Sequence, residues 1–331
     1  MAPRQENERL RRVRRVEEMQ PTKLERKRRE EPTTPDEIAH EISRELGDLA
    51  EVRLPDACDE PILSQAVRKT IFEWMIEQNA IADLEAVGVK PRVACLLYGP
   101  PGCGKTTLAH HFAARLGMPL VIVNGEMVRA SHLGETGRNI FKLFACLRRH
   151  KDTAVGFFDE LDAVATARAS TDGQACEKEL NAAVTALLTN IERHDGRFFA
   201  ATNIGDGIDQ AIWRRFGIHI KVELPEFDER FAIIKRYLAP FTVHDDTIDE
   251  IAMLTKGAAP ALLRQLCEGI KRSLVLGPRM KRDVADIVAV IAGVASNIAP
   301  HPSLEAPRLW ADENCTSSLV RKPWPPTLVK G

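Results

Sequence analysis

The sequence lacks the features of secreted, disulfide-stabilised and membrane-spanning proteins. No apolar run among its 331 residues approaches the roughly 20 residues that cross a bilayer. Its charged N-terminus has no hydrophobic core of the kind found in a secretory signal. The seven cysteines are odd in number and never form a CxxC pair, which argues against a disulfide framework or a zinc site. We therefore expect a protein of the reducing cytoplasm without a membrane segment.

The sequence is also poor in aromatic residues and has no excess of charge of either sign. Only 5% of the residues are aromatic, whereas 44% are hydrophobic, which is typical of a globular protein with one large or two modest domains. The 46 basic residues almost balance the 47 acidic ones. This balance argues against a protein whose main task is to neutralise nucleic acid.

The N-terminal part of the chain changes character at residue 34. Residues 1–33 alternate clusters of arginine and glutamate without any aromatic residue, which indicates a flexible, charged leader. It could contact nucleic acid or an acidic partner, but a solvated arm is the simpler interpretation. Residues 34–90 start with the sequence TPDE, which supplies a cap, a proline at the first helical position and a capping-box glutamate. We expect this segment to be helical and to end in a linker.

The middle of the chain alternates short apolar runs with helix-length segments, which predicts a parallel sheet covered by helices on both faces. This α/β core is expected over residues 91–225, followed by a helical lid over 226–298 and a Pro-rich tail with two tryptophans over 299–331. The five apolar runs are residues 93–98, 119–123, 154–158, 197–202 and 218–222.

A phosphate-binding loop follows the first apolar run. Residues 99–107 read GPPGCGKTT and match G-x-x-x-x-G-K-[ST] between a strand and a helix, the context that the motif requires. The glycines free backbone N–H groups for the β-phosphate, while Lys105 should reach the β- and γ-phosphates and Thr106 should hold Mg²⁺. We therefore predict a site for ATP and Mg²⁺. Its nucleotide-binding residues are Gly99, Pro100, Pro101, Gly102, Cys103, Gly104, Lys105, Thr106 and Thr107.

Polar residues end the third and fourth apolar runs. Asp159 and Glu160 follow the third run, at the strand end where α/β sheets bind ligands. We expect Asp159 to help hold Mg²⁺ through water and Glu160 to polarise the attacking water. Asn203 ends the fourth run and is expected to position the same water, although an asparagine there is by itself an ordinary turn residue. Because a glutamate that can act as the base is present at position 160, we favour hydrolysis over nucleotide sensing.

Two adjacent arginines precede the fifth apolar run. Arg214 and Arg215 stand between Trp213 and Phe216. Neighbouring arginines are usually a solvated pair, but arginines also stabilise the charge that builds up on a γ-phosphate, in cis or from a neighbouring subunit. Action from a neighbour would require assembly into a ring or a stack.

The set GPPGCGKT, FFDELD, ATN and AIWRRF, followed by a helical lid, resembles the AAA family of ATPases, and within it the proteins that remodel and unfold other proteins. The resemblance covers roughly residues 55–295. It implies a P-loop NTPase fold with a parallel five-stranded sheet in the order 5-1-4-3-2, a small C-terminal helical lid and a hexameric ring. It also implies that Arg214 and Arg215 are arginine fingers and that Asn203 is the first sensor, with Arg264 as the candidate for the second.

The segment RASHLGETGRNIF, residues 129–141, then corresponds to a loop that contacts substrate in the ring's pore. In the family this loop carries an aromatic, a hydrophobic residue and a glycine; here the triplet is His132, Leu133 and Gly134. Histidine is smaller, more polar and titratable near neutral pH. Substrate contact is favoured over a plain turn. Residues 173–181 could form a second pore loop, although a solvated helix end is the preferred interpretation.

Three functions are compatible with these motifs. The first is an ATP-driven ring that remodels a protein substrate, with a separate protease as a possible partner, because the chain has no protease motif such as HExxH. The second is a nucleic-acid-directed ATPase, which only the basic leader favours. The third is a regulatory switch timed by hydrolysis. Glu160 and the paired arginines favour the first.

Overall fold

The computed structural model of the protein describes most of the chain from residue 34 onward. The leader of residues 1–33, the triplet His132-Leu133-Gly134 and the segment 173–181 lie outside the described residues. No helix in the described part is long and apolar enough to cross a membrane. The described residues are 34–124, 135–162, 185–204, 208, 210–312 and 314–328.

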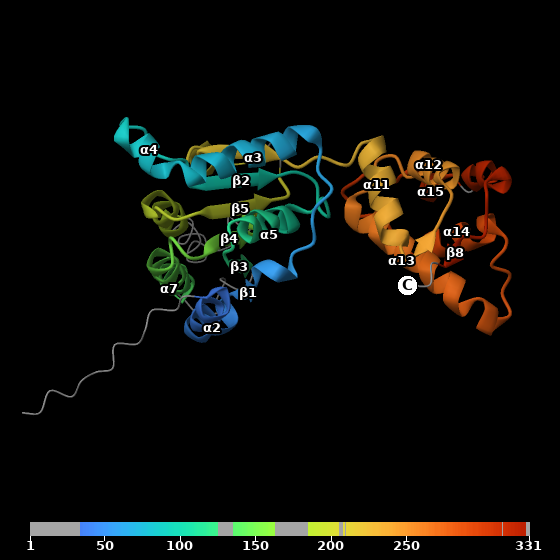
Figure 1. Ribbon diagram of the computed structural model, residues 1–331, viewed down its shortest axis with the longest axis horizontal. Coiled ribbons are helices and arrows are strands. Elements are labelled where there is room, and N and C mark those ends of the chain that lie inside the picture. Colours follow the sequence, from blue (N-terminus) through green and yellow to red (C-terminus); the bar gives the residue numbers. More distant parts are fainter. Residues whose placement is uncertain are drawn as a thin grey trace, which may run out of the picture. The chain divides into compact units, whose positions relative to one another are not determined.

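A six-stranded sheet forms the centre of the α/β core (Figure 1). Its strands β2 to β6 coincide with the five apolar runs and pair in parallel in the order β6-β2-β5-β4-β3. Counted along the chain from β2, this is the expected order 5-1-4-3-2, so the prediction of the fold is confirmed. The strands are β1 (Glu51–Arg53), β2 (Ala94–Tyr98), β3 (Leu120–Asn124), β4 (Val155–Asp159), β5 (Phe198–Thr202) and β6 (Ile218–Lys221).

Strand β1 adds a sixth strand to the five parallel strands that the sequence predicted. It pairs antiparallel with the edge strand β3, and Val52 lies opposite Val121. β1 belongs to the segment 34–90, for which the sequence predicted helices and a linker. A strand of three residues is too short for an alternating pattern to stand out in the sequence.

Helices cover both faces of the sheet, as its apolar strands require. α3 and α5 share one hydrophobic core with the sheet, and α2 and α7 share the other. Along β5, Phe199 joins the first core and Phe198 the second, because successive side chains of a strand point to opposite faces. Among the described residues of this part, the α-helices are α2 (Pro35–Leu46), α3 (Gln65–Asn79), α4 (Ile81–Ala86), α5 (Lys105–Arg115), α7 (Glu135–Arg149) and α10 (Gln210–Trp213).

Helix α2 begins as its sequence predicts. The Thr34 hydroxyl accepts a hydrogen bond from the Glu37 backbone N–H, and the Glu37 carboxylate accepts one from the Thr34 N–H. Pro35 occupies the first helical position. Such a cap contributes about 1 kcal/mol to helix stability. The apolar side of α2, which includes Ile42 and Leu46, packs in the core that also contains α7.

The C-terminal helices form the lid, and the expected Pro-rich tail is part of it. Leu309 and Leu319 are buried in the same core as the lid helices. The indole N–H of Trp310 donates to the carbonyl oxygens of Ala295 and Ile298, 3.1 and 2.9 Å away. The elements are α11 (Phe227–Leu238), β7 (Phe241–Thr242), α12 (Asp245–Leu254), α13 (Pro260–Leu276), α14 (Ile287–Ala295), α15 (Arg308–Ala311) and β8 (Thr327–Leu328), with β7 and β8 paired antiparallel.

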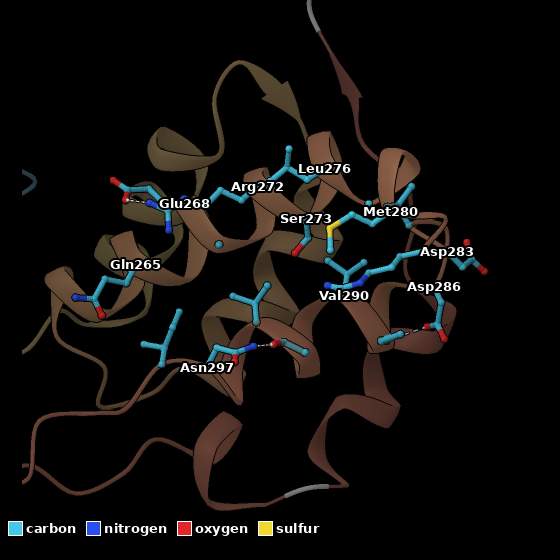
Figure 2. A pocket seen from close by; sticks show the side chains of 18 of the residues that line it. Gln265, Glu268, Arg272, Ser273, Leu276, Met280, Asp283, Asp286, Val290 and Asn297 are labelled. Atoms are coloured by element: carbon cyan, nitrogen blue, oxygen red, sulfur yellow. Dashed lines mark hydrogen bonds and ion pairs between the residues drawn. The ribbon is translucent and has the colours of Figure 1, made fainter.

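The lid carries a groove of about 950 Å³ between α13 and α14 (Figure 2). Glu268 and Arg272 on α13 and Asn297 after α14 are among its lining residues. All of the lining residues lie between 265 and 299, so the groove is separate from the sequence motifs of the α/β core.

Candidate functional site

The loop of residues 99–104 connects β2 to α5 and depends on its glycines. Gly99, Gly102 and Gly104 have φ values of 142°, 72° and 86°, which L side chains rarely adopt. A Cβ atom on Gly99 would lie 2.1 Å from the backbone oxygen of Val222. Helix α5 then begins at Lys105 without a side-chain cap, so its first N–H groups are available to an anion.

The side chain of Lys105, the first residue of α5, points back into this loop. Its ammonium donates to the carbonyl oxygens of Gly99 and Pro100, 2.8 and 2.9 Å away, and to Oδ1 of Asn203 at 2.8 Å. Only 7% of the residue is exposed, and this burial lowers the pKa of its amine, while Asp159 is among the groups that act in the opposite direction. The structure therefore brings together two of the residues singled out in the sequence, Lys105 and Asn203.

Thr106 joins the loop to the end of β4. Its Oγ1 donates a hydrogen bond to Oδ2 of Asp159 over 2.8 Å. The other carboxylate oxygen of Asp159 accepts a hydrogen bond from the backbone N–H of Glu160 at 3.0 Å. The hydroxyl and the carboxylate that the sequence assigns to one Mg²⁺ thus lie within hydrogen-bond distance of each other.

Glu160 has an unusual backbone. Its φ is 53°, in the left-handed region that costs a non-glycine residue on the order of 1 kcal/mol or more. Such strain persists where the surrounding structure imposes it, which is common at functional sites. Two residues later, the Asp162 carboxylate accepts a hydrogen bond from the Asn203 backbone N–H at 3.3 Å. The carboxyl ends of β4 and β5 are therefore linked beside the phosphate-binding loop.

Arg214 and Arg215 are placed apart from this cluster. They follow α10 and precede the amino end of β6, whereas the phosphate-binding loop follows the carboxyl end of the parallel neighbour β2. Arg214 hydrogen-bonds Gln210, and Arg215 forms an ion pair with Glu192 at 3.3 Å. Trp213 stacks on His219 with 3.8 Å between the ring centroids, which fixes the turn that carries both arginines.

Arg264, the candidate second sensor, is held on the lid. Its guanidinium forms an ion pair with Glu268 at 2.8 Å and lies 5.6 Å from the ring centroid of Tyr237. The structure thus gives Arg264 partners within the lid. The predicted pore-loop triplet lies outside the described residues.

A hollow of about 290 Å³ beside Cys103 was missed by sequence reasoning. Its lining includes residues 62–64, Ala66 and Val67 before and within α3, residues 219–226 around the end of β6, and Pro260 at the start of α13. The backbone N–H of Ala261 donates to the carbonyl oxygen of Gly102 at 3.2 Å, which connects the lid to the loop at this point. Apart from Cys103, which belongs to the phosphate-binding loop, the lining residues carry no motif and come from segments far apart in the chain, so the sequence did not predict the hollow.

In this site a glycine-rich loop connects a buried parallel strand to a helix, and an aspartate accepts a hydrogen bond from the threonine at the start of that helix. This arrangement defines the class of P-loop nucleotide-binding proteins. Residues 95–224 match the profile of the family described as "ATPase family associated with various cellular activities (AAA)". Residues 95–224 therefore carry an AAA family ATPase domain, and the description of this family indicates ATP hydrolysis.

Known proteins resemble this chain over different lengths. A proteasome-activating nucleotidase of Archaeoglobus fulgidus is 29% identical over 281 residues, which cover 83% of this chain and 69% of that protein. An uncharacterized AAA family ATPase of Sinorhizobium fredii, y4kL, is 39% identical over 179 residues, 54% of this chain and 52% of that protein. The crystal structure of the FIGL-1 AAA domain is 22% identical with a TM-score of 0.61, covering 82% of this chain and 93% of that one. This last likeness concerns the fold.

Proposed function

We propose that this chain couples ATP hydrolysis to the remodelling or unfolding of a protein substrate in a homo-oligomeric ring. The observation that carries the hydrolytic part is the cluster in which Lys105 contacts Asn203 and Thr106 contacts Asp159. The likeness to proteasome-activating nucleotidases supports a protein as the substrate, with a separate protease as a possible partner. A hexameric ring and a location in the cytoplasm are further parts of this proposal.

Thr106 at the start of α5 and Asp159 at the end of β4 fit a magnesium ion. Mg²⁺ prefers oxygen ligands, and the Thr106 hydroxyl and the Asp159 carboxylate offer them 2.8 Å apart. The ion, when bound with ATP, neutralises charge on the phosphate oxygens. Thr106 and Asp159 hold it in this proposal, directly or through water.

Lys105 and Asn203 exchange partners when nucleotide binds. The Lys105 ammonium donates three hydrogen bonds, all to protein oxygens, so a phosphate oxygen must replace at least one of them. Replacing Asn203 frees its amide to orient the attacking water. Glu160 then accepts a proton from that water, and the hollow beside Cys103 receives the nucleoside part of ATP.

Arg214 and Arg215 act in the site of a neighbouring subunit. The two arginines precede the amino end of β6, whereas the phosphate-binding loop of their own chain follows the carboxyl end of the parallel strand β2. The arginines and that loop thus lie at opposite ends of the strands, which supports action on a neighbour. Arg214 is exposed and is therefore available to a second copy. The triplet His132-Leu133-Gly134 contacts the substrate in the centre of such a ring.

The variant Glu160→Gln tests this proposal. It should retain ATP and the assembled ring, because the amide keeps the shape of the side chain but accepts no proton. We expect a protein substrate to co-purify with the variant in ATP and to be released in ADP. The exposed residue Glu305 offers a matched control, Glu305→Gln. Recovery of nucleic acid without protein would contradict the proposed substrate class.

A further inference from the structure

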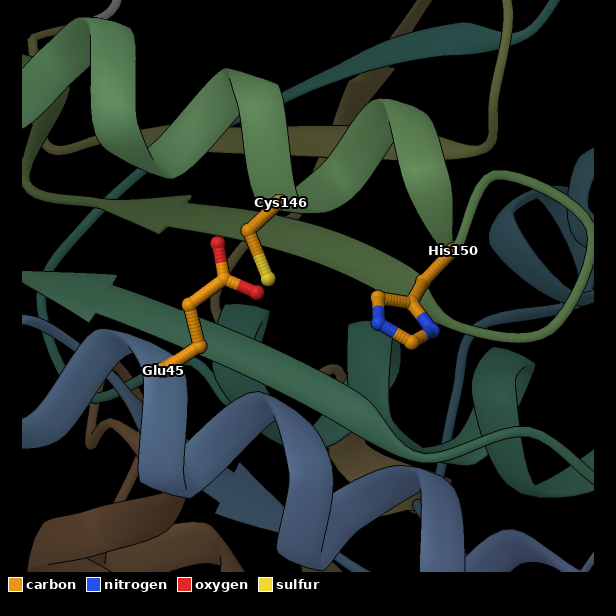
Figure 3. Close-up of side chains that lie close together, drawn as sticks. All are labelled: Glu45, Cys146 and His150. Atoms are coloured by element: carbon orange, nitrogen blue, oxygen red, sulfur yellow. The ribbon is translucent and has the colours of Figure 1, made fainter. Parts of the chain in front are cut away.

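Helices α2 and α7 bring three side chains of different chemistry together, away from the nucleotide loop. Cys146 on α7 and His150, which follows its end, are four residues apart and so lie on one side of the helix. Glu45 reaches them from the last turn of α2. One ligand atom of each residue lies within 4.8 Å of the other two (Figure 3). Cys146 and His150 are buried, and Glu45 is half-buried.

We propose that Glu45, Cys146 and His150 form a binding site for Zn²⁺. The thiolate, imidazole and carboxylate groups are the three types of ligand that this ion takes from proteins, at about 2.0–2.3 Å. Ligand atoms around a tetrahedral zinc ion are therefore about 3.3–3.7 Å apart. Side-chain rotations that draw the three atoms together by about 1 Å produce this arrangement. One position remains open to water, as in other three-ligand sites.

Charged residues surround the three groups, and the Glu45 side chain is partly exposed. Glu41 lies one turn before Glu45 on α2, and its negative charge acts on both Cys146 and His150, where the positive charge of Arg149 acts in the opposite direction. Arg149 forms an ion pair with Oε1 of Glu45. Because a carboxylate has two oxygens, Glu45 can keep this ion pair and bind the metal through the other oxygen. When the ion binds, the Cys146 thiol releases its proton to the solvent and the thiolate forms the metal bond.

The site joins an N-terminal helix to the core. α2 is held mainly by apolar contacts with α7 and the adjacent sheet face, and a shared metal ion adds a link at its C-terminal end. Because an ion that binds only the folded chain stabilises it, Zn²⁺ should raise the melting temperature. Neither CxxC spacing nor a pair of histidines marks such a site, since its third ligand comes from a helix about 100 residues earlier in the sequence.

Cobalt binding to the full chain, without nucleotide and with a phosphine reductant, tests this inference. Co²⁺ is a spectroscopic substitute for Zn²⁺ that gives a sulfur-to-metal charge-transfer band when a thiolate binds it. We expect one equivalent of Co²⁺ to produce this band and visible bands of tetrahedral intensity, and one equivalent of Zn²⁺ to displace it. Absence of the charge-transfer band in the wild type would overturn the inference.

Variants assign the ligands. Cys146→Ser should lose the charge-transfer band, and His150→Ala and Glu45→Gln should bind Zn²⁺ at least tenfold more weakly in competition with a chromophoric chelator. Cys58→Ser removes a more accessible thiol and should leave the band unchanged. A band that persists in Cys146→Ser overturns the assignment. If Cys146→Ser is misfolded by circular dichroism, the Glu45→Gln competition decides, and wild-type affinity in that variant overturns the inference.

Discussion

The hydroxyl of Thr106 donates a hydrogen bond to Oδ2 of Asp159 over 2.8 Å, although 53 residues separate them in the chain. This contact joins the start of α5 to the end of β4. The hydrogen bond from Lys105 to Asn203 joins the same helix to the end of β5. The polar groups of the proposed ATPase site are thus assembled by the fold itself, so their removal should affect the chemistry more than the stability of the sheet.

Lys105→Ala should weaken ATP binding by about 10- to 100-fold, because a hydrogen bond to a charged group contributes about 1.5–3 kcal/mol. A fluorescent ATP analogue titrated into both proteins measures the change. Lys235→Ala, at an exposed lysine paired with Asp245, is the control and should bind normally. Equal affinity of Lys105→Ala and the wild type would show that this loop does not hold the phosphates.

Gly99→Ala should lower the free energy of unfolding by at least about 2 kcal/mol, because the added Cβ meets the backbone oxygen of Val222 and φ is 142°. Gly137→Ala, inside α7 with open space around the new Cβ, should instead raise it by about 0.5 kcal/mol or more. Urea denaturation measures both. If Gly99→Ala leaves the free energy of unfolding unchanged, Val222 can move away from the new Cβ without destabilising the fold.

Arg215→Ala should abolish ATP hydrolysis without unfolding the protein, since its ion pair with Glu192 is partly exposed and contributes less than about 1 kcal/mol. If Arg215 acts in a neighbour's site, mixing this variant with Glu160→Gln subunits restores activity at interfaces that combine an intact Arg215 with an intact Glu160. Arg193→Ala, at a nearby exposed arginine, should remain active. No recovery at any mixing ratio would argue against action in trans.

The buried imidazole of His194 should make stability depend on pH. It packs edge-on against Phe144 and Phe198, and burial lowers its pKa from 6.5 to about 4. Between these two values the unfolded chain binds a proton at this residue and the folded chain does not. The free energy of unfolding therefore falls as pH falls through this window, by up to about 3 kcal/mol from this residue.

The substitution His194→Leu isolates this contribution. When the pH is lowered from 7 to 4, the unfolding free energy of the wild type should fall by about 3 kcal/mol more than that of the variant. Denaturant titrations at several pH values measure it, with His301→Leu as the control at an exposed histidine. A pH-independent difference would show that the folded protein protonates His194 normally.

The sequence predicted those parts of the fold and site that depend on local patterns. Strands β2 to β5 are largely apolar, and the loop at residues 99–107 has a fixed spacing, so both could be found from the sequence. β1 is too short to show a pattern. The hollow beside Cys103 and the cluster of Cys146 with Glu45 arise from segments that meet only after folding. The expected tail joins the lid through indole hydrogen bonds such as that of Trp310, which composition alone does not reveal.

The most direct test of the central claim is the ATPase rate of the assembled wild-type protein with an unfolded protein or with DNA as the added polymer. The Glu160→Gln variant supplies the background and should hydrolyse ATP about 10²- to 10⁴-fold more slowly. We expect the unfolded protein to increase the wild-type rate several-fold, DNA to leave it unchanged, and His132→Ala to reduce the stimulation. Stimulation by DNA with none by the unfolded protein would contradict the account.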